Sequence, residues 1–154
     1  MQIRIATKKD YNIINSMLIK LHEYHVKNDP STFVSIETFF TKKEYYKRIK
    51  NKHIYYIAEE NNIPMGIIGI NSCINDFINL LFVNSLYVEE KYRNLGIATK
   101  LFVEVIKYYN ENCQTNKWCD YLNLNVSSFN TSAIKLYEKL NFKFQSHNMG
   151  LKLK

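Results

Sequence analysis

Apolar and polar residues follow two periodicities along the chain, and these periodicities predict its strands and helices. Short apolar or alternating runs between polar turns predict strands over 2–6, 53–59, 65–72, 79–88 and 121–126. Apolar residues spaced three and four apart predict amphipathic helices over 11–27, 41–50, 97–108 and 133–140. Two further short strands, 142–145 and 149–153, are expected to close the chain as a hairpin.

The order of these elements predicts an α/β fold with a mixed, mostly antiparallel central sheet. The three strands between 53 and 88 are joined by short polar turns, which favours an antiparallel meander. The strand–helix–strand unit from Leu80 to Val126 predicts a parallel central strand pair with a right-handed crossover. We expect helices on both faces of the sheet. No linker interrupts the pattern, so residues 1–154 are expected to form one domain.

The amino-acid composition excludes several classes of protein. Hydrophobic residues make up 46% of the chain, which is enough for a core and excludes global disorder. No apolar run approaches the roughly 20 residues of a membrane span, so no membrane association is expected. The first residues lack the basic region and apolar run of a secretory signal, and a cytoplasmic location is the corresponding expectation.

Charge and cysteines narrow the choice only a little further. The net charge of +7 fits a polyanionic partner, such as nucleic acid or a phosphate-rich cofactor, but it also fits the Lys- and Asn-rich composition of an A/T-rich genome. No known nucleic-acid-binding signature is present, so no nucleic-acid partner is expected. The odd number and wide spacing of Cys73, Cys113 and Cys119 argue against a disulfide framework and against a structural metal site.

The segment 93–99 carries the first chemical signal. A predicted strand runs into a short loop, and the loop opens the helix that begins near Ile97. The first N–H groups of a helix have no intrahelical partner, and with the helix dipole they favour an anion. Gly96 lets a phosphate approach the backbone, Ala98 keeps the next turn small, and Arg93 adds a positive charge. The segment therefore predicts a pyrophosphate-binding loop, although a tight turn alone would also favour the glycine.

A second constellation follows the strand that ends near Val126. Asn130 can cap the next helix, and Tyr137 lies seven residues on, about two turns along the same side. With these residues the chain resembles the GNAT superfamily of acyl-CoA-dependent N-acyltransferases. Arg93-x-x-Gly96-x-Ala98 is similar to the family's R/Q-x-x-G-x-G/A loop, and the segment from Asn130 through Ala133 and Tyr137 to Asn141-Phe142 is similar to its N-x-x-A-x-x-x-Y-x-x-x-G-F helix. Asn141 replaces a glycine at a position expected to have a positive φ, which asparagine tolerates.

The resemblance implies acetyl-CoA as the cofactor and assigns roles to individual residues. A bulge in the central strand would splay it from the next parallel strand and make room for pantetheine. The pantetheine would meet the backbone of Leu86, Tyr87 and Val88, with the Val88 N–H polarising the thioester carbonyl. The pyrophosphate would bind the loop, whose residues are Arg93, Asn94, Leu95, Gly96, Ile97, Ala98 and Thr99. Asn130, Ala133 and Tyr137 would lie along the pantetheine arm, with Tyr137 as the acid that protonates the leaving thiolate.

The acceptor side is less defined. The resemblance implies a small-molecule primary amine, such as a metabolite, polyamine, amino acid or aminoglycoside-like compound, and a homodimer is common in the family. His25 and Phe33 are candidates for acceptor contact, and Glu23, Glu89 and Glu90 are candidates for the base. A non-catalytic acyl-CoA sensor and a protein-amine acetyltransferase remain alternatives, because a fold does not fix a function.

Overall fold

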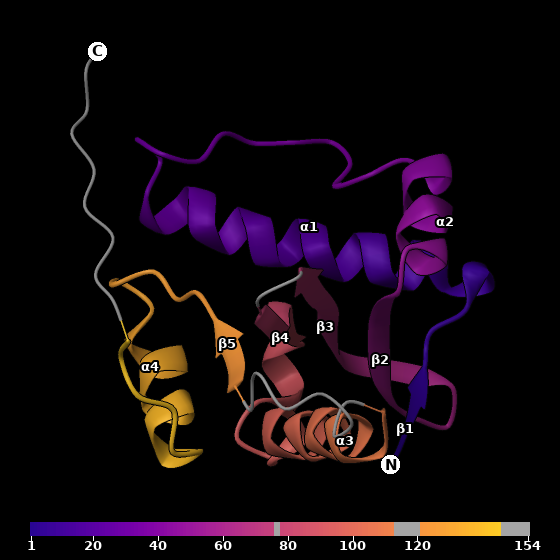
Figure 1. The fold of residues 1–154 in the computed structure, drawn as a ribbon. Helices are drawn as coiled ribbons and strands as arrows, with labels where there is room; N and C mark the ends of the chain where they lie inside the picture. Colours follow the sequence, from indigo (N-terminus) through magenta and orange to yellow (C-terminus); the bar gives the residue numbers. More distant parts are fainter. Residues whose placement is uncertain (76–77, 113–120, 146–154) are drawn as a thin grey trace.

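Five strands form one sheet, which the computed structural model shows together with the helices that cover it (Figure 1). The structure describes residues 1–75, 78–112 and 121–145. The strands lie in sequence order across the sheet and are β1 (Gln2–Ile5), β2 (His53–Glu60), β3 (Ile63–Asn75), β4 (Ile78–Val88) and β5 (Tyr121–Leu124). The first four pair antiparallel, and β5 pairs parallel with β4. The prediction of a mixed sheet with one parallel pair is confirmed.

Within the described residues, four α-helices flank the sheet, together with two short 3-10 helices. They are η1 (Lys8–Asp10), α1 (Tyr11–Asn28), α2 (Lys42–Lys50), η2 (Glu90–Tyr92), α3 (Ile97–Asn112) and α4 (Thr131–Lys139). α1 and α2 pack on one face around Ile14, Leu18 and Tyr45. α3 packs on the other face through Leu101 and Phe102, with α4 beside it. The predicted helices on both faces are therefore confirmed.

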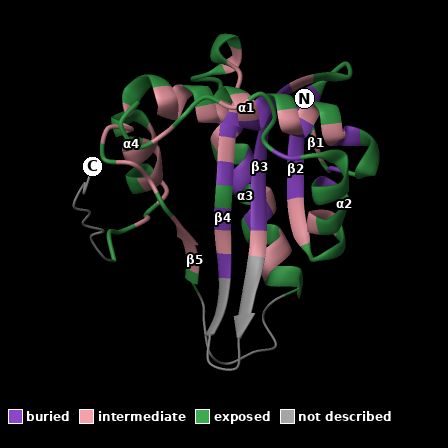
Figure 2. Cartoon of the chain, turned by 90° about the horizontal axis from the view of Figure 1, so that it is seen from above, coloured by how far each residue is buried: buried purple, intermediate pink, exposed green. Residues whose placement is uncertain are grey.

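Burial decreases from the middle of the sheet toward β5. Figure 2 shows β2, β3 and much of β4 as buried, whereas β5 and α4 are half-buried or exposed. Successive residues of β3 point to opposite faces, so Ile67 enters the core under α1 while Ile68 enters the core above α3. The part of the fold around β5 and α4 is therefore the less tightly enclosed part.

An extra residue interrupts the pairing of β3 with β4. Gly69 pairs with Ser85 and Ile70 pairs with Val83, so Asn84 bulges out of β4. The parallel pairing of β4 with β5 ends at the same level, at Val83 and Leu124. Beyond this point the chain after β5 turns away toward α4 while β4 continues (Figure 2). The expected bulge and splay are both present.

Ion pairs anchor the first strand and the start of α1. Arg4 donates to both carboxylate oxygens of Asp10, at 3.0 and 2.8 Å, and to Glu59 at 2.9 Å. Asp10 also accepts from the backbone N–H of Thr7 at 2.7 Å and completes a capping box with that residue. The pKa of Asp10 is lowered to about 2, chiefly because its charged form accepts hydrogen bonds from Arg4.

The predicted C-terminal hairpin is wrong in its first half. Residues 142–145 form no strand, because the Phe142 N–H donates to the Tyr137 carbonyl at 2.9 Å and thereby closes the end of α4. The Phe142 ring then packs on Phe102, and Phe144 is 65% exposed. The second half, 149–153, lies outside the described residues, as do Cys113 and Cys119 and the side chain of Cys73.

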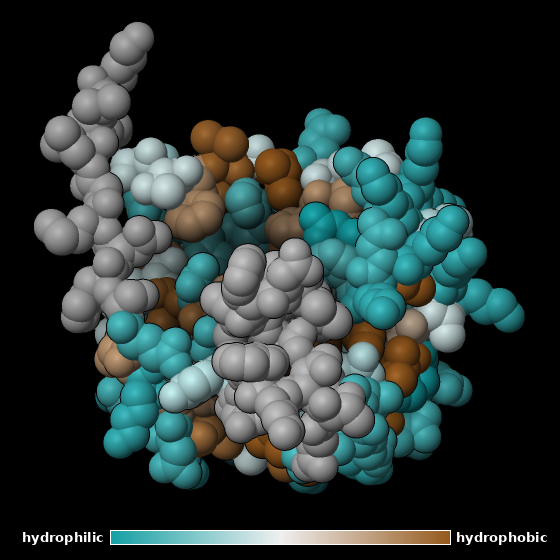
Figure 3. All heavy atoms as spheres, in the orientation of Figure 1, coloured by the Kyte–Doolittle hydropathy of each residue, from teal (hydrophilic) through white to brown (hydrophobic). Residues whose placement is uncertain are grey.

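No helix in the described part of the chain is long and apolar enough to cross a membrane. The surface around α2 is mostly hydrophilic, and apolar side chains appear elsewhere in separate patches (Figure 3). α2 carries five of the chain's 21 Lys and Arg residues, so its outer side is strongly basic.

Replacing Asp10 by Asn should lower the free energy of unfolding by about 1 to 2 kcal/mol at pH 7. The folded-state pKa of Asp10 lies below its ordinary value of 3.8, so its contribution is present above pH 4 and is lost as the pH falls toward 2. Urea unfolding at pH 7 and pH 3 measures both effects. Glu60→Gln, which removes an exposed partner of the N-terminus, is the control and should change little. Equal losses for the two variants at pH 7 would contradict this account.

Replacing Gly69 by Ala should destabilise the bulge by about 2 kcal/mol, because the new Cβ has no room. It would lie 2.4 Å from Ser85 Oγ and 2.7 Å from the Tyr55 ring. Gly96→Ala is the matched control, since nothing lies within 4 Å of its added Cβ and only its positive φ of 74° opposes the change. Thermal unfolding should show the larger loss for Gly69→Ala, and the reverse order would contradict the packing described for the bulge.

Candidate functional site

At the end of β4, backbone N–H groups that β3 does not bond point to the opening beside β5. The Glu89 N–H donates to the Met65 carbonyl at 2.9 Å, which fixes the alternation of the antiparallel ladder. On that alternation Tyr87 bonds to β3, whereas the N–H groups of Leu86 and Val88 point to the side from which β5 has departed. The predicted backbone donor at Val88 therefore faces the splay. The Leu86 and Val88 side chains pack toward α3, and the Tyr87 side chain packs under α1.

Two residues with positive φ shape the loop before α3. Asn94 and Gly96 both have positive φ values, of 63° and 74°. α3 begins at Ile97, and the first helical bond runs from the Lys100 N–H to the Gly96 carbonyl at 3.1 Å. The N–H groups of Ile97, Ala98 and Thr99 therefore precede the first intrahelical donor. Ile97 is buried and Ala98 is half-buried, whereas Leu95, Gly96 and Thr99 are exposed.

Arg93 lies against the end of β4. Its Nε donates to the Val88 carbonyl at 3.1 Å, and its guanidinium lies 5.9 Å from the centre of the Tyr87 ring. A longer ion pair at 3.6 Å joins it to the exposed Glu90. The predicted loop cation is thus held beside Val88, and its role toward a pyrophosphate stays a prediction.

The start and the end of α4 are both fixed by the residues of the second motif. Asn130 accepts a hydrogen bond from the Ala133 N–H at 3.2 Å, which confirms its predicted capping role. Ala133 is half-buried in the first turn. Asn141 has a φ of 67°, as expected for the residue that replaces the family's glycine, and its N–H donates to the Glu138 carbonyl at 2.9 Å.

Tyr137 lies on the side of α4 that faces α3 and the splay. Its ring packs edge-on against Phe102, with centroids 6.0 Å apart, and against Phe142 at 5.8 Å. Burial raises its pKa to about 12, because the apolar surroundings disfavour the charged phenolate. The phenol therefore keeps its proton at neutral pH, which is the state that a general acid needs.

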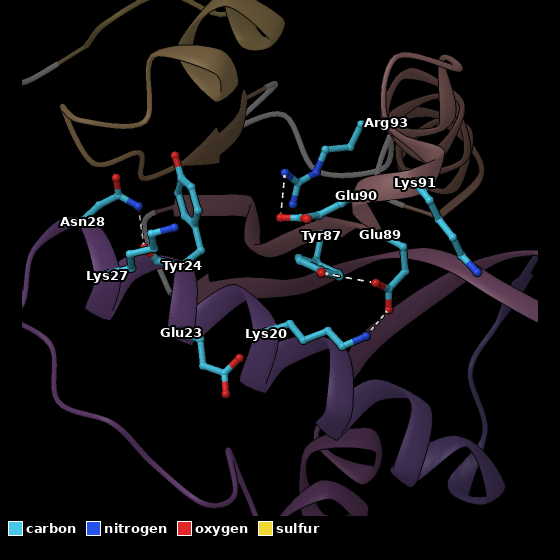
Figure 4. Close-up of a pocket in the computed structure, with 10 residues that line it drawn as sticks. All are labelled: Lys20, Glu23, Tyr24, Lys27, Asn28, Tyr87, Glu89, Glu90, Lys91 and Arg93. Atoms are coloured by element: carbon cyan, nitrogen blue, oxygen red, sulfur yellow. Dashed lines mark hydrogen bonds and ion pairs between the residues drawn. The ribbon is translucent and has the colours of Figure 1, made fainter.

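Two clefts border the last turn of α1, and one of them reaches the end of β4. The β5–α4 cleft, of about 990 Å³, is lined by β5, the chain that follows it and α4, and includes Tyr137 and His25. The α1–β4 cleft, of about 680 Å³, is lined by the last turns of α1 and by the residues that end β4, as the close-up in Figure 4 shows. Adjacent residues of α1, Tyr24 and His25, line one cleft each, so α1 forms the border between them.

The predicted acceptor residues lie at this border but do not form one group. His25 packs against Phe33 at 5.1 Å and against Phe129 at 5.6 Å, and burial lowers the pKa of its imidazole. His25 lines the β5–α4 cleft, whereas Glu23 is exposed and lines the α1–β4 cleft. Phe33 contacts the His25 ring but lines neither cleft.

The three candidate carboxylates differ in their partners. Glu89 accepts a hydrogen bond from the Lys20 ammonium at 2.6 Å and another from the Tyr87 hydroxyl at 3.4 Å, and its side chain is only 20% exposed. The Glu90 side chain is 82% exposed, and Glu23 is also exposed. The structure thus separates one fixed carboxylate from two solvated ones.

Sequence reasoning missed Lys20 and Tyr24. Tyr24 lines the α1–β4 cleft and donates to the Asn130 side chain at 3.4 Å, which joins α1 to the start of α4. The signal was present in the sequence, because Lys20, Glu23, Tyr24 and Lys27 recur at helical spacing and share one polar face of α1. Among the side chains that the structure describes, no three His, Cys, Asp or Glu residues are grouped so that they could hold a metal ion.

Comparisons with solved structures show which fold this is. The tetramutant of the BH1408 protein from Bacillus halodurans is 24% identical, with a TM-score of 0.86 over 99% of this chain and 100% of that one. An aminoglycoside acetyltransferase from an uncultured soil metagenomic sample, solved with sisomicin, is 17% identical, with a TM-score of 0.73 over 99% and 96%. A predicted acetyltransferase from Clostridium acetobutylicum, solved with acetyl-CoA, is 19% identical, with a TM-score of 0.68 over 99% and 96%.

The family is shown by the sequence itself. A search of curated proteins gives no match. The sequence model of the family described as acetyltransferase (GNAT) domain matches residues 51–144, which is more than half of the chain. This stretch contains the bulge in β4, the loop before α3 and the whole of α4. The chain therefore belongs to the GNAT acetyltransferase family.

Proposed function

We propose that this protein is an N-acetyltransferase that moves an acetyl group from acetyl-CoA to a primary amine of a small molecule. The observation that carries the proposal is the bulge at Asn84, which opens the sheet between Val88 and α4. Family membership supports acyl transfer in general. The identity of the cofactor, the class of amine and the roles of individual residues are proposed in addition to family membership.

The residues present fit an acyl-CoA cofactor. Apart from Gly96 and its two chain neighbours, no protein atom lies within 4 Å of the Cβ that Gly96 lacks, so the loop leaves open space beside the free N–H groups of α3. That combination suits a pyrophosphate. The β5–α4 cleft, of about 990 Å³, is lined by apolar residues such as Leu124 and Ile134 together with polar ones such as Asn123 and Asn125. A pantetheine arm is a chain of amides and methylenes, so it can hydrogen-bond to the polar groups of this cleft and pack against its apolar side chains.

Each residue of the site then has a task. Bound acetyl-CoA supplies the acetyl group as a thioester. The Val88 N–H would donate to the thioester carbonyl oxygen and stabilise the negative charge that develops there. The Tyr137 hydroxyl would give its proton to the sulfur as the carbon–sulfur bond breaks. Arg93 would act as a positioning residue, because its bond to the Val88 carbonyl fixes the end of β4.

The acceptor would enter through the α1–β4 cleft. This cleft reaches β4 at Tyr87 and Glu89, the two neighbours of Val88, and so lies beside the proposed reaction centre. Its nitrogen must be neutral to attack, whereas alkylamines are mostly protonated at pH 7. We therefore expect the rate to rise with pH while the amine loses its proton.

Replacing Tyr137 by Phe should lower kcat for acetylation by roughly 100-fold and leave the affinity for acetyl-CoA almost unchanged. The ring and its packing on Phe102 remain, and only the proton donor is lost. Thiol release over a panel of primary amines measures kcat, and calorimetry measures affinity. Because the pKa of Tyr137 is about 12, loss of its proton should cause no fall in the wild-type rate below pH 10. Undiminished kcat in the variant would contradict the assigned role. Tight binding without turnover on any amine would favour a sensor.

A further inference from the structure

An ion pair joins the two walls of the α1–β4 cleft. The Lys20 ammonium on α1 donates to Glu89 Oε1 at 2.6 Å, as Figure 4 shows. The lysine side chain is 45% exposed, whereas the glutamate side chain is 20% exposed. The carboxylate is thus the enclosed partner, and the ammonium approaches it from the open side of the cleft.

The Glu89 carboxylate is fixed relative to the proposed reaction centre. Glu89 directly follows Val88, and its backbone N–H bonds to the Met65 carbonyl at 2.9 Å. The Tyr87 hydroxyl, 3.4 Å from Glu89 Oε2, contacts the second carboxylate oxygen. Oε1 is therefore the oxygen that faces the Lys20 ammonium. It belongs to the residue directly after Val88, whose N–H is expected to polarise the thioester.

The group that Lys20 binds to this oxygen is a primary ammonium, which is also the group that the proposed acceptor carries. Its side chain ends in an unbranched methylene chain and a primary ammonium. The pKa of Lys20 is raised, chiefly by the hydrogen bond to Glu89, so the group is fully charged at neutral pH. An acceptor ammonium that replaced it would exchange one charged hydrogen bond for an equivalent one.

We propose that Glu89 is the binding site for the ammonium group of the acceptor, an unbranched primary alkylamine, and that Lys20 occupies this site until the acceptor displaces it. This inference rests on the proposed function for its role in catalysis, but the binding site stands on its own contacts. Exposed ion pairs contribute at most about 1 kcal/mol, so Lys20 can be displaced at small cost.

The other carboxylates of the cleft do not offer an equivalent site. The Glu90 side chain is 82% exposed and lies 3.6 Å from Arg93 Nη1, where a solvated charge attracts a cation only weakly. Glu23 also lines the cleft, but it is exposed. Glu89 alone among these three carboxylates combines partial burial with two fixed neighbours, Tyr87 and Lys20.

A purely structural ion pair between α1 and β4 would make a different prediction. If the pair were only structural, replacing Lys20 or replacing Glu89 would break the same contact, and both variants would change amine binding in the same direction. Under the proposal their effects on amine binding have opposite signs. Lys20→Met removes a resident competitor and keeps the apolar stem, whereas Glu89→Gln removes the charge that binds the amine.

The test measures binding of n-butylammonium to the protein without cofactor, by following NMR chemical shifts during titration. Lys20→Met should bind it about threefold more tightly than wild type, and Glu89→Gln at least threefold more weakly. tert-Butylammonium, with the same charge on a branched carbon, should bind more weakly than n-butylammonium. Lys42→Met and Glu60→Gln change the same charges outside both clefts and should bind like wild type.

Two results would overturn the inference. The first is a shift of n-butylammonium affinity in the same direction for Lys20→Met and Glu89→Gln, accompanied by equal losses of melting temperature. That result would mean that the ion pair is only structural. The second is the absence of n-butylammonium binding to Lys20→Met at millimolar concentration. Thiol release from acetyl-CoA is measured separately on wild type. Opposite shifts in binding without any thiol release would support the amine site and contradict the proposed acetyl transfer.

Discussion

One extra residue in β4, Asn84, determines where the central sheet opens. Without Asn84 the strand would continue its regular pairing, and β5 could follow it to the end of the sheet. With it, the pairing with β5 stops at Val83, and the last residues of β4 keep only one bonded neighbour. A sheet edge in the middle of a fold exposes backbone donors that must find a partner, and a ligand chain with amide groups can be that partner. The close packing of Gly69 against Ser85 and Tyr55 holds the bulge at one position.

The surrounding elements give that opening its chemistry. α3 begins just beyond β4, so its free N–H groups lie at one end of the opening. α4 follows β5, so its capped first turn and Tyr137 form the opposite wall. α1 crosses above, and its adjacent residues Tyr24 and His25 line the α1–β4 cleft and the β5–α4 cleft respectively. Under the proposed function, these parts would together supply a phosphate end, a middle for the pantetheine arm and a cation-binding side.

Much of the fold could be predicted from spacing, because each helix and strand carries its own periodicity. The helix from Tyr11 ends at Asn28, one residue beyond the predicted end and before Pro30, and Asn141 adopts the positive φ inferred from its position. Residues 142–145 were mispredicted because their apolar residues serve the end of α4 and not a strand. The family motifs located the loop before α3 and Tyr137, but no local pattern could pair Lys20 with Glu89. That contact depends on how α1 crosses the sheet, and only the packed structure reveals it.

Calorimetric titration of acetyl-CoA tests the central claim most directly, namely that the loop before α3 and the splayed end of β4 form a cofactor site. Wild type should bind, and Gly96→Glu should bind at least 10-fold more weakly, because its carboxylate would occupy the open space beside the α3 N–H groups and repel a phosphate. Gly96→Ala carries the same backbone strain without the charge and should lose far less affinity. If all three proteins are folded and bind acetyl-CoA equally, or if wild type does not bind it, the account of the site is wrong.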